Sequence, residues 1–193
     1  MERREVLKRS ALILGIAITA PTAMAVLNGC KASPVTNDWQ PLFFSKEEAN
    51  TLGDIADRII PETDTPGARA AGVHKFMDEA IFSNYPVEHQ TIFKAKLSNF
   101  SRACADKFDK TFTQLSEEDQ DAFLKMQESE ALEFNKTNKD KEDYHIWDSL
   151  KEMTVAGYTG SEIGATQFLI FDPIPGEYKG CIDLSEVGGT WAI

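Results

Sequence analysis

Apolar residues recur every three or four positions along five segments of this chain, which is the spacing of an amphipathic helix. The segments span about residues 46–60, 73–83, 87–108, 117–134 and 142–158. In the third segment the apolar positions are Phe93, Leu97, Phe100, Cys104 and Phe108. The pattern predicts five helices and places Cys104 on the packed side of the third.

Polar residues and prolines indicate where some of these helices begin and end. Ser45 precedes Glu48 by three residues, which is the spacing of a capping box. Ser116 is followed by three acidic residues, which favour the first turn of a helix. Pro61 is expected to end the first helix, and Pro66-Gly67 to form a turn before the second.

Glycine and proline interrupt the last 37 residues, 157–193, where helical spacing remains only near residues 162–169. We expect extended or irregular chain here, with one short helix. The sequence therefore predicts an all-α fold. It consists of a single irregular domain of five to six helices at residues 43–193, with an extended Gly/Pro-rich C-terminal tail.

The first thirty residues have a different composition. Arg3-Arg4 precede an apolar run of about 17 residues, which ends in Leu27-Asn28-Gly29-Cys30. A basic segment followed by an apolar one is typical of an export signal, and paired arginines are typical of the twin-arginine route. The last four residues look like a lipobox, whose cysteine is acylated and becomes the mature N-terminus.

We therefore predict a twin-arginine signal peptide at residues 1–29 and a lipidated N-terminus and tether at residues 30–42. The mature protein is expected in the periplasm, where acyl chains on Cys30 hold it on a membrane. The alternative is an uncleaved signal anchor, because about 17 apolar residues can just span a bilayer.

The charge of the chain excludes one class of partner. The formal charge is −11, and it becomes −13 when residues 1–29 are removed. Nucleic acids are bound by basic patches, so no nucleic-acid partner is expected. Adsorption to anionic lipid is equally disfavoured, which leaves membrane attachment to the lipid anchor.

The chain has three cysteines. If Cys30 is acylated, Cys104 and Cys181 remain in an oxidising compartment, where pairing is the usual outcome. A disulfide between Cys104 and Cys181 is therefore expected. Two free thiols are the alternative.

Few residue patterns point to catalysis. The chain has no glycine-rich nucleotide loop, no G-x-S-x-G and no C-x-x-C. Glu142 and His145 form one Glu-x-x-His on an expected helix, whereas di-iron bundles need two such motifs. A solvated histidine is the simpler interpretation, and an enzyme with a metal at this motif is the alternative. We expect no catalytic, metal or cofactor site.

Two blocks of residues carry a family resemblance. The first runs from Phe43-Phe44-Ser45 through Ile59-Ile60-Pro61-Glu62 and Asp64-Thr65-Pro66-Gly67 to Gly72-Val73. The second runs from Gly157-Tyr158-Thr159-Gly160 to Asp172-Pro173-Ile174-Pro175-Gly176, with Trp191 near the end. Over about residues 43–191 the chain resembles the gluconate 2-dehydrogenase subunit 3 family, the small subunits of membrane-bound, flavin-dependent sugar dehydrogenases.

The resemblance implies a non-catalytic subunit. Its large partner would be a glucose–methanol–choline-type oxidoreductase that carries FAD and oxidises a sugar or sugar acid, with a c-type cytochrome taking the electrons. Such large subunits usually lack an export signal, so the small subunit would guide export and stabilise its partner. The resemblance thus implies FAD in the partner and no cofactor in this chain.

The Gly/Pro-rich tail is the expected partner interface, because so open a segment buries little of itself. Aromatic residues and stiff proline segments would anchor it at low entropic cost. The candidate anchors are Tyr158, Phe168, Phe171, Pro173, Pro175, Tyr178 and Trp191. Two alternatives stay open. The tail wraps its own helices, or the chain is a lipid-anchored binding or scaffold protein without a redox partner.

Overall fold

The computed structural model describes residues 39–138, 143–174, 176–177 and 180–192. The chain divides into two compact units, Met1–Trp39 and Gln40–Ile193, and every element named below belongs to the second. The predicted signal peptide, with Arg3 and Arg4, and the predicted lipid site at Cys30 lie outside the described residues. No helix in the described ranges is both long and apolar enough to cross a membrane.

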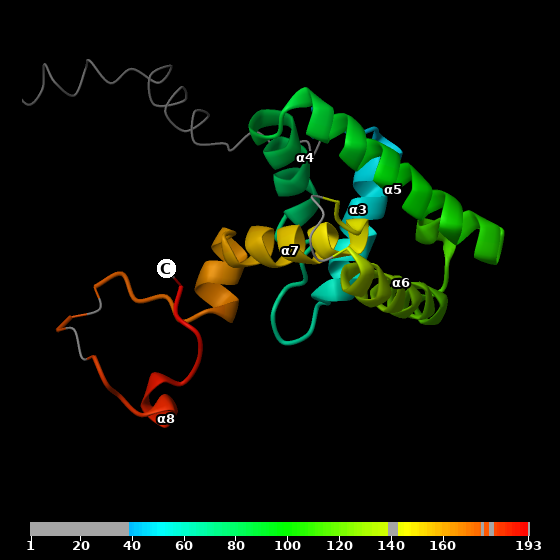
Figure 1. Cartoon of the computed structure of the whole chain (residues 1–193). Coiled ribbons are helices and arrows are strands. Elements are labelled where there is room, and N and C mark those ends of the chain that lie inside the picture. Colours follow the sequence, from blue (N-terminus) through cyan, green and yellow to red (C-terminus); the bar gives the residue numbers. More distant parts are fainter. Residues whose placement is uncertain (1–38, 139–142, 175, 178–179, 193) are drawn as a thin grey trace, which may run out of the picture. The chain divides into compact units, whose positions relative to one another are not determined.

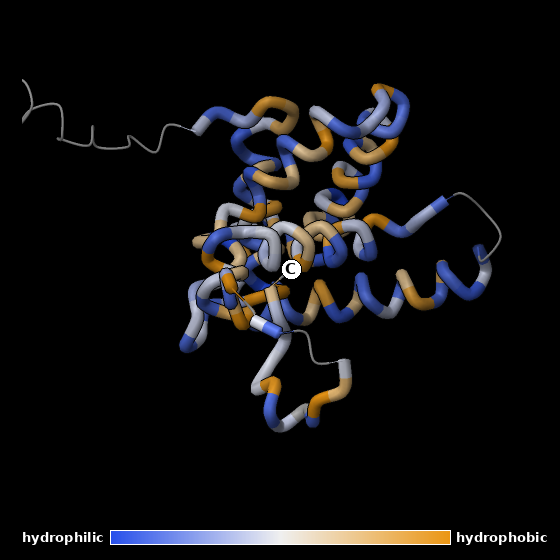
Figure 2. The backbone as a smooth tube through the Cα atoms, turned by 90° about the vertical axis from the view of Figure 1, so that its left-hand side faces the viewer, coloured by the Kyte–Doolittle hydropathy of each residue, from blue (hydrophilic) through white to orange (hydrophobic). Residues whose placement is uncertain are grey.

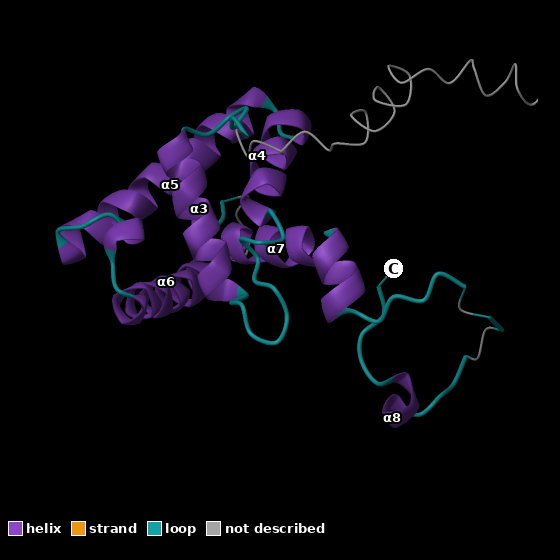
Figure 3. Cartoon of the chain, turned by 180° about the vertical axis from the view of Figure 1, so that it is seen from behind, coloured by secondary structure: helices purple, strands orange, loops and turns teal. Residues whose placement is uncertain are grey.

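The fold is all-α, as predicted. The five long helices are α3 (Lys46–Ile59), α4 (Val73–Asn84), α5 (Val87–Phe108), α6 (Glu117–Thr137) and α7 (Ile146–Thr159) (Figure 1). A 3₁₀ turn, η1 (Phe112–Gln114), links α5 to α6, and the π-helix η2 (Gly164–Phe168) and α8 (Leu184–Val187) follow α7. Figure 3 shows loops but no strand between these helices in the part of the chain described.

Helices α3, α4 and α7 pack on one another, and α5 and α6 each pack on α7. Leu52 of α3, Ile81 of α4 and Leu150 of α7 are completely buried. Burying a side chain of this kind stabilises the fold by about 1.5–3 kcal/mol. Along α6, apolar and polar stretches alternate with each helical turn (Figure 2), because one face of the helix is packed and the other faces solvent.

A cluster of phenylalanines joins α5, η1 and α6. Phe123 of α6 packs edge-on against Phe100 of α5, with ring centroids 5.0 Å apart, and lies 6.1 Å from Phe112 of η1. All three rings are buried. The predicted apolar face of α5 is therefore confirmed, and Cys104 lies on it.

The predicted helix starts are confirmed at two positions. The Ser45 hydroxyl accepts a hydrogen bond from the Glu48 N–H (3.1 Å), and the Glu48 carboxylate accepts one from the Ser45 N–H (2.8 Å). The Ser116 hydroxyl accepts from the Asp119 N–H (3.2 Å). Each cap satisfies backbone donors that the first turn of a helix leaves without partners.

Helix α7 begins at Ile146, about four residues later than predicted. His145 has an extended backbone, and its Nδ1 accepts a hydrogen bond from the Trp147 N–H (3.3 Å), so it caps the helix. Burial lowers the pKa of His145. His145 thus precedes α7, and Glu142, the other residue of the expected Glu-x-x-His, lies outside the described residues. Among the described residues no three His, Cys, Asp or Glu side chains are grouped to hold a metal ion.

A buried carboxylate attaches the start of the domain to α4. Asp78, only 1 % exposed, accepts hydrogen bonds from the backbone N–H groups of Leu42, Phe43 and Phe44 at 2.6, 3.0 and 2.9 Å. Three donors compensate for the desolvation of the carboxylate. The residues that lead into α3 are thus tied to α4.

The predicted disulfide is wrong, because Cys104 and Cys181 are both free thiols in the structure. Cys104 is completely buried, where its Sγ lies 3.7 Å from the Lys110 carbonyl oxygen and burial raises the pKa of the thiol. Cys181 is exposed in the C-terminal segment. The apolar stripe of α5 places Cys104 in the core, away from the exposed Cys181.

Candidate partner-binding surface

Residues 170–191 form a closed loop, which we call the C-terminal loop. The Ile170 N–H donates to the Thr190 carbonyl (2.8 Å), and the Ala192 N–H donates to the Ile170 carbonyl (2.9 Å). These bonds form a parallel bridge between Ile170 and Trp191. Figure 1 shows the loop running from the end of η2 through α8 and back to its own start. Its two ends are therefore held together.

Large apolar side chains are exposed along η2 and this loop. They are between 40 % and 83 % exposed in a segment of only 24 residues. The five are Phe168, Phe171, Ile174, Ile182 and Trp191. The described chain gives them little cover, because η2 packs on α7 while no helix packs extensively on α8. Exposed apolar groups gathered in one segment are typical of a binding surface.

The predicted anchors divide into three groups. Phe168, Phe171, Pro173 and Trp191 are exposed, so they are available to a partner. Pro175 and Tyr178 lie outside the described residues. Tyr158 is completely buried and cannot serve as a surface anchor.

Tyr158 instead connects two parts of the chain. Its hydroxyl donates to the Pro66 carbonyl (2.8 Å), 92 residues earlier in the sequence. Its ring packs edge-on against Phe168 of η2, with centroids 5.5 Å apart. The two sequence blocks that carry the family resemblance therefore meet at this side chain.

Glycines allow the close packing around Tyr158. A Cβ on Gly164 would overlap the Tyr158 carbonyl oxygen, and one on Gly157 would lie 2.6 Å from the Phe76 ring. The Ser161 hydroxyl donates to the same Tyr158 carbonyl (2.7 Å) and accepts from the Gly164 N–H (2.9 Å). The glycine-rich sequence at 157–164 thus lets η2 fold back against the end of α7.

The loop between α3 and α4 is fixed at its base. The Ala68 N–H donates to the Ile60 carbonyl (2.9 Å), and the Asp57 carboxylate accepts from the Arg69 N–H (3.2 Å). Gly67 fills the space between them, since a Cβ there would lie 2.5 Å from Asp57 Oδ1. Residues 61–64, at the tip, are exposed. Pro66-Gly67 predicted a turn, but not its connection to Tyr158.

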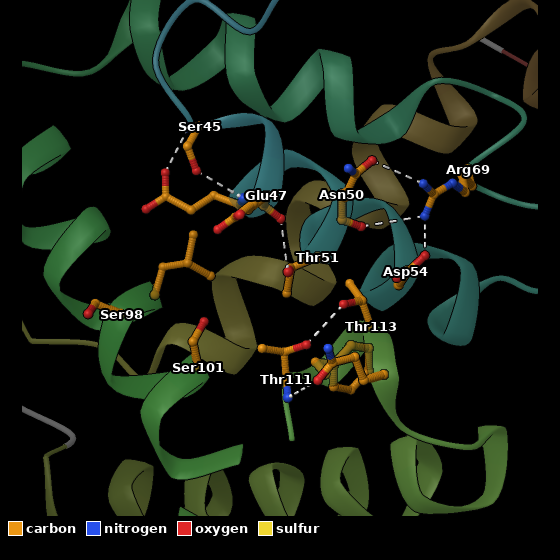
Figure 4. Close-up of a pocket in the computed structure, with 14 residues that line it drawn as sticks. Ser45, Glu47, Asn50, Thr51, Asp54, Arg69, Ser98, Ser101, Thr111 and Thr113 are labelled. Carbon is orange, nitrogen blue, oxygen red and sulfur yellow. Dashed lines mark hydrogen bonds and ion pairs between the residues drawn. The ribbon is translucent and has the colours of Figure 1, made fainter. Parts of the chain in front are cut away.

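A polar pocket of about 710 Å³ lies between α3, α5 and η1 (Figure 4). Asn50 and Asp54 of α3 both bind the Arg69 guanidinium on one wall. Ser98 and Ser101 line the α5 side, above a floor that includes the buried Leu97 and Phe112. Sequence patterns did not indicate this pocket, because its lining comes from four separate segments: α3, Arg69 of the loop that follows it, α5 and η1.

The walls of this pocket carry several hydrogen-bonding side chains. Figure 4 shows Thr111 bonded to Thr113, and Asp54 directed at Arg69. Burial raises the pKa of Asp54, partly offset by the charge of Arg69. The side chains of these two pairs are thus already bonded to each other within the pocket walls. The exposed apolar surface of η2 and the C-terminal loop is therefore the stronger candidate site.

The sequence matches one family model over residues 46–176, which is more than half of the chain. That family is described as gluconate 2-dehydrogenase subunit 3. No curated protein and no solved structure matches this chain. The match includes α3 to η2 and the first residues of the C-terminal loop.

Proposed function

Because the chain belongs to the gluconate 2-dehydrogenase subunit 3 family, we propose that it is the non-catalytic small subunit of a flavin-dependent sugar or sugar-acid dehydrogenase. Its partner is a glucose–methanol–choline-type oxidoreductase that carries the FAD. This chain stabilises the partner and guides it through the twin-arginine route, which transports folded proteins. A c-type cytochrome is the proposed electron acceptor.

The observation that supports this proposal is the exposed apolar surface of η2 and the C-terminal loop. Phe168, Phe171 and Ile174 each leave more than half of their surface exposed. Burying apolar surface contributes about 25 cal/mol per Å², so large aromatic side chains are strong anchors. A subunit that binds a catalytic partner needs such a surface.

The anchoring scheme follows from the N-terminal sequence. Arg3-Arg4 would be read by the export machinery, and acyl chains on Cys30 would hold the assembled complex on the periplasmic side of a membrane. An R3K/R4K variant keeps the charge but not the planar guanidinium pair. We expect it to leave this chain and the sugar dehydrogenase activity in the cytoplasm. We expect Cys30→Ser to lose labelling by a palmitate analogue.

The proposal is tested by capturing an affinity-tagged chain from detergent-solubilised membranes of its host. We expect the captured material to show flavin absorbance and to reduce a dye when sugar is added. The chain purified alone should be colourless and inactive in the same assay. Capture of folded, membrane-attached chain without flavin would overturn the proposal and favour a lipid-anchored scaffold.

A further inference from the structure

Acidic residues dominate the surface around the exposed apolar side chains. Residues 157–193 contain five acidic residues and one basic residue, whereas residues 68–156 contain seventeen acidic and twelve basic ones. All five acidic side chains of the C-terminal segment are exposed: Glu162, Asp172, Glu177, Asp183 and Glu186. The apolar anchors therefore lie in a strongly negative field.

The loop between α3 and α4 adds to this field. Glu62 and Asp64 are exposed at its tip, and residues 61–67 include no basic residue. Within the described ranges neither carboxylate forms an ion pair with a basic side chain, although Asp64 accepts a hydrogen bond from the Thr63 hydroxyl (2.9 Å). Both charges are therefore available to a partner.

The base of this loop is held in place before any partner binds. Tyr158 fixes Pro66 and contacts Phe168, so the loop and η2 share one buried support. The Asp57–Arg69 hydrogen bond and the close fit of Gly67 hold the other side of its base. A loop whose base is fixed loses less conformational entropy on binding than a free segment, which favours its use as a recognition element.

From these observations we propose that the residue 61–66 loop, η2 and the C-terminal loop form one docking surface, apolar with acidic charges around it. The catalytic partner then presents an apolar groove bordered by Lys and Arg side chains. This inference rests on the proposed function and specifies the chemistry of the partner's face. A second copy of this chain, with the same negative surface, would be repelled.

The physical consequence is an association rate that depends on salt. Complementary charges steer two proteins together at low ionic strength, and screening removes the effect as salt rises. Apolar anchors such as Phe171 mainly slow dissociation, because they are buried only after docking. The association rate should thus report the contribution of the charges, and the dissociation rate that of the apolar contacts.

The experiment measures binding of the full mature chain to its captured flavoprotein by stopped-flow at about 20 mM and about 500 mM salt. We expect the variant E62K/D64K to associate roughly tenfold more slowly at low salt and almost normally at high salt. The control D106K/E133K makes the same charge change at exposed positions on α5 and α6. It should alter the rate less than about twofold.

The outcomes separate this inference from the proposed function. If wild-type chain binds no flavoprotein, the proposed function is wrong and the inference fails with it. If wild-type chain binds but E62K/D64K behaves like D106K/E133K at both salt concentrations, the acidic docking surface alone is wrong. Circular dichroism and melting curves equal to wild type should show that both variants are folded.

Discussion

The helices α3–α7 bury most of their large apolar side chains, whereas the segment from η2 onward leaves most of its described ones exposed. In the helices, Leu52, Phe93 and Phe123 have essentially no exposed surface. In the C-terminal segment, Phe168 and Phe171 are more than half exposed, although their residue type is the same as in the core. Residue type alone does not determine burial. A helix concentrates apolar groups on one face, whereas an irregular loop with few neighbours has no second layer to cover them.

The largest expected difference in stability between the two regions is tested by one phenylalanine in each. Phe123→Ala removes a ring that packs against Phe100 and Phe112, and it should lower the free energy of unfolding by about 3–5 kcal/mol. Phe171→Ala, in the C-terminal loop, should change it by less than about 0.5 kcal/mol. Urea denaturation followed by circular dichroism measures both, and similar losses would show that the loop packs as core.

The helical region should also respond to pH through His74. Burial lowers the pKa of His74 to about 4, with the charges of Arg69 and Lys75 adding to the effect, from an ordinary value near 6.5. The neutral form is thus favoured in the folded state. The contribution of neutral His74 to folding stability is complete above about pH 6.5 and is lost as pH falls toward 4. Because the ring is only partly buried, solvent screening keeps this loss below about 3 kcal/mol.

Urea midpoints at pH 4, 5.5 and 7 should therefore show a steeper acid loss for wild type than for His74→Gln. Other titrating groups contribute equally to the pH dependence of both proteins, so their contributions cancel in the comparison. One of them is Glu128, whose pKa is lowered by its hydrogen bonds to Lys151 and Trp147. Parallel pH curves would mean that His74 titrates normally in the folded protein.

The carboxylate that ties the start of the domain to α4 should have an intermediate effect. Asp78→Asn replaces one acceptor oxygen by a donor that faces backbone N–H groups, and we expect a loss of about 1–3 kcal/mol. Glu79→Gln, at the exposed neighbouring position, is the control and should be near neutral. Thermal melts of both variants give the comparison. Equal melting temperatures would show that the three hydrogen bonds are not maintained.

The smallest expected effect on stability comes from removing the C-terminal loop. Truncation after Leu169 keeps η2 and its Phe168–Tyr158 contact, so the helices should still melt cooperatively within a few degrees of wild type. Capture of the flavoprotein should nevertheless be lost. A truncated chain that captures as much flavoprotein as the full chain would assign the interface elsewhere.

Much of the fold was predictable because it depends on interactions between near neighbours. The Ser45–Glu48 capping box spans three residues, and the α5 stripe repeats every three or four. The start of α7 was predicted about four residues too early, because His145 has an extended backbone and caps the helix. Local rules locate a helix well but locate its first residue less well.

The candidate site was predictable only in part. Composition marked the Gly/Pro-rich tail and its exposed Phe168, Phe171 and Trp191 as candidates for binding. The sequence of the residue 61–66 loop predicts only a turn that connects two helices, although this loop also belongs to the first block of the family resemblance. Its position beside η2 was not visible, because no sequence spacing relates it to the tail.

The sequence by itself determined the helices, their caps and the segment that remains irregular, since these follow from hydrogen bonds and periodicity over a few residues. Only the tertiary structure decided which aromatic and sulfur groups are accessible. Tyr158 is buried by a contact with Pro66 that spans 92 residues, and Cys104 is enclosed by the helical core while Cys181 remains exposed. Burial is set by neighbours that are distant along the chain, and chain folding alone brings them together.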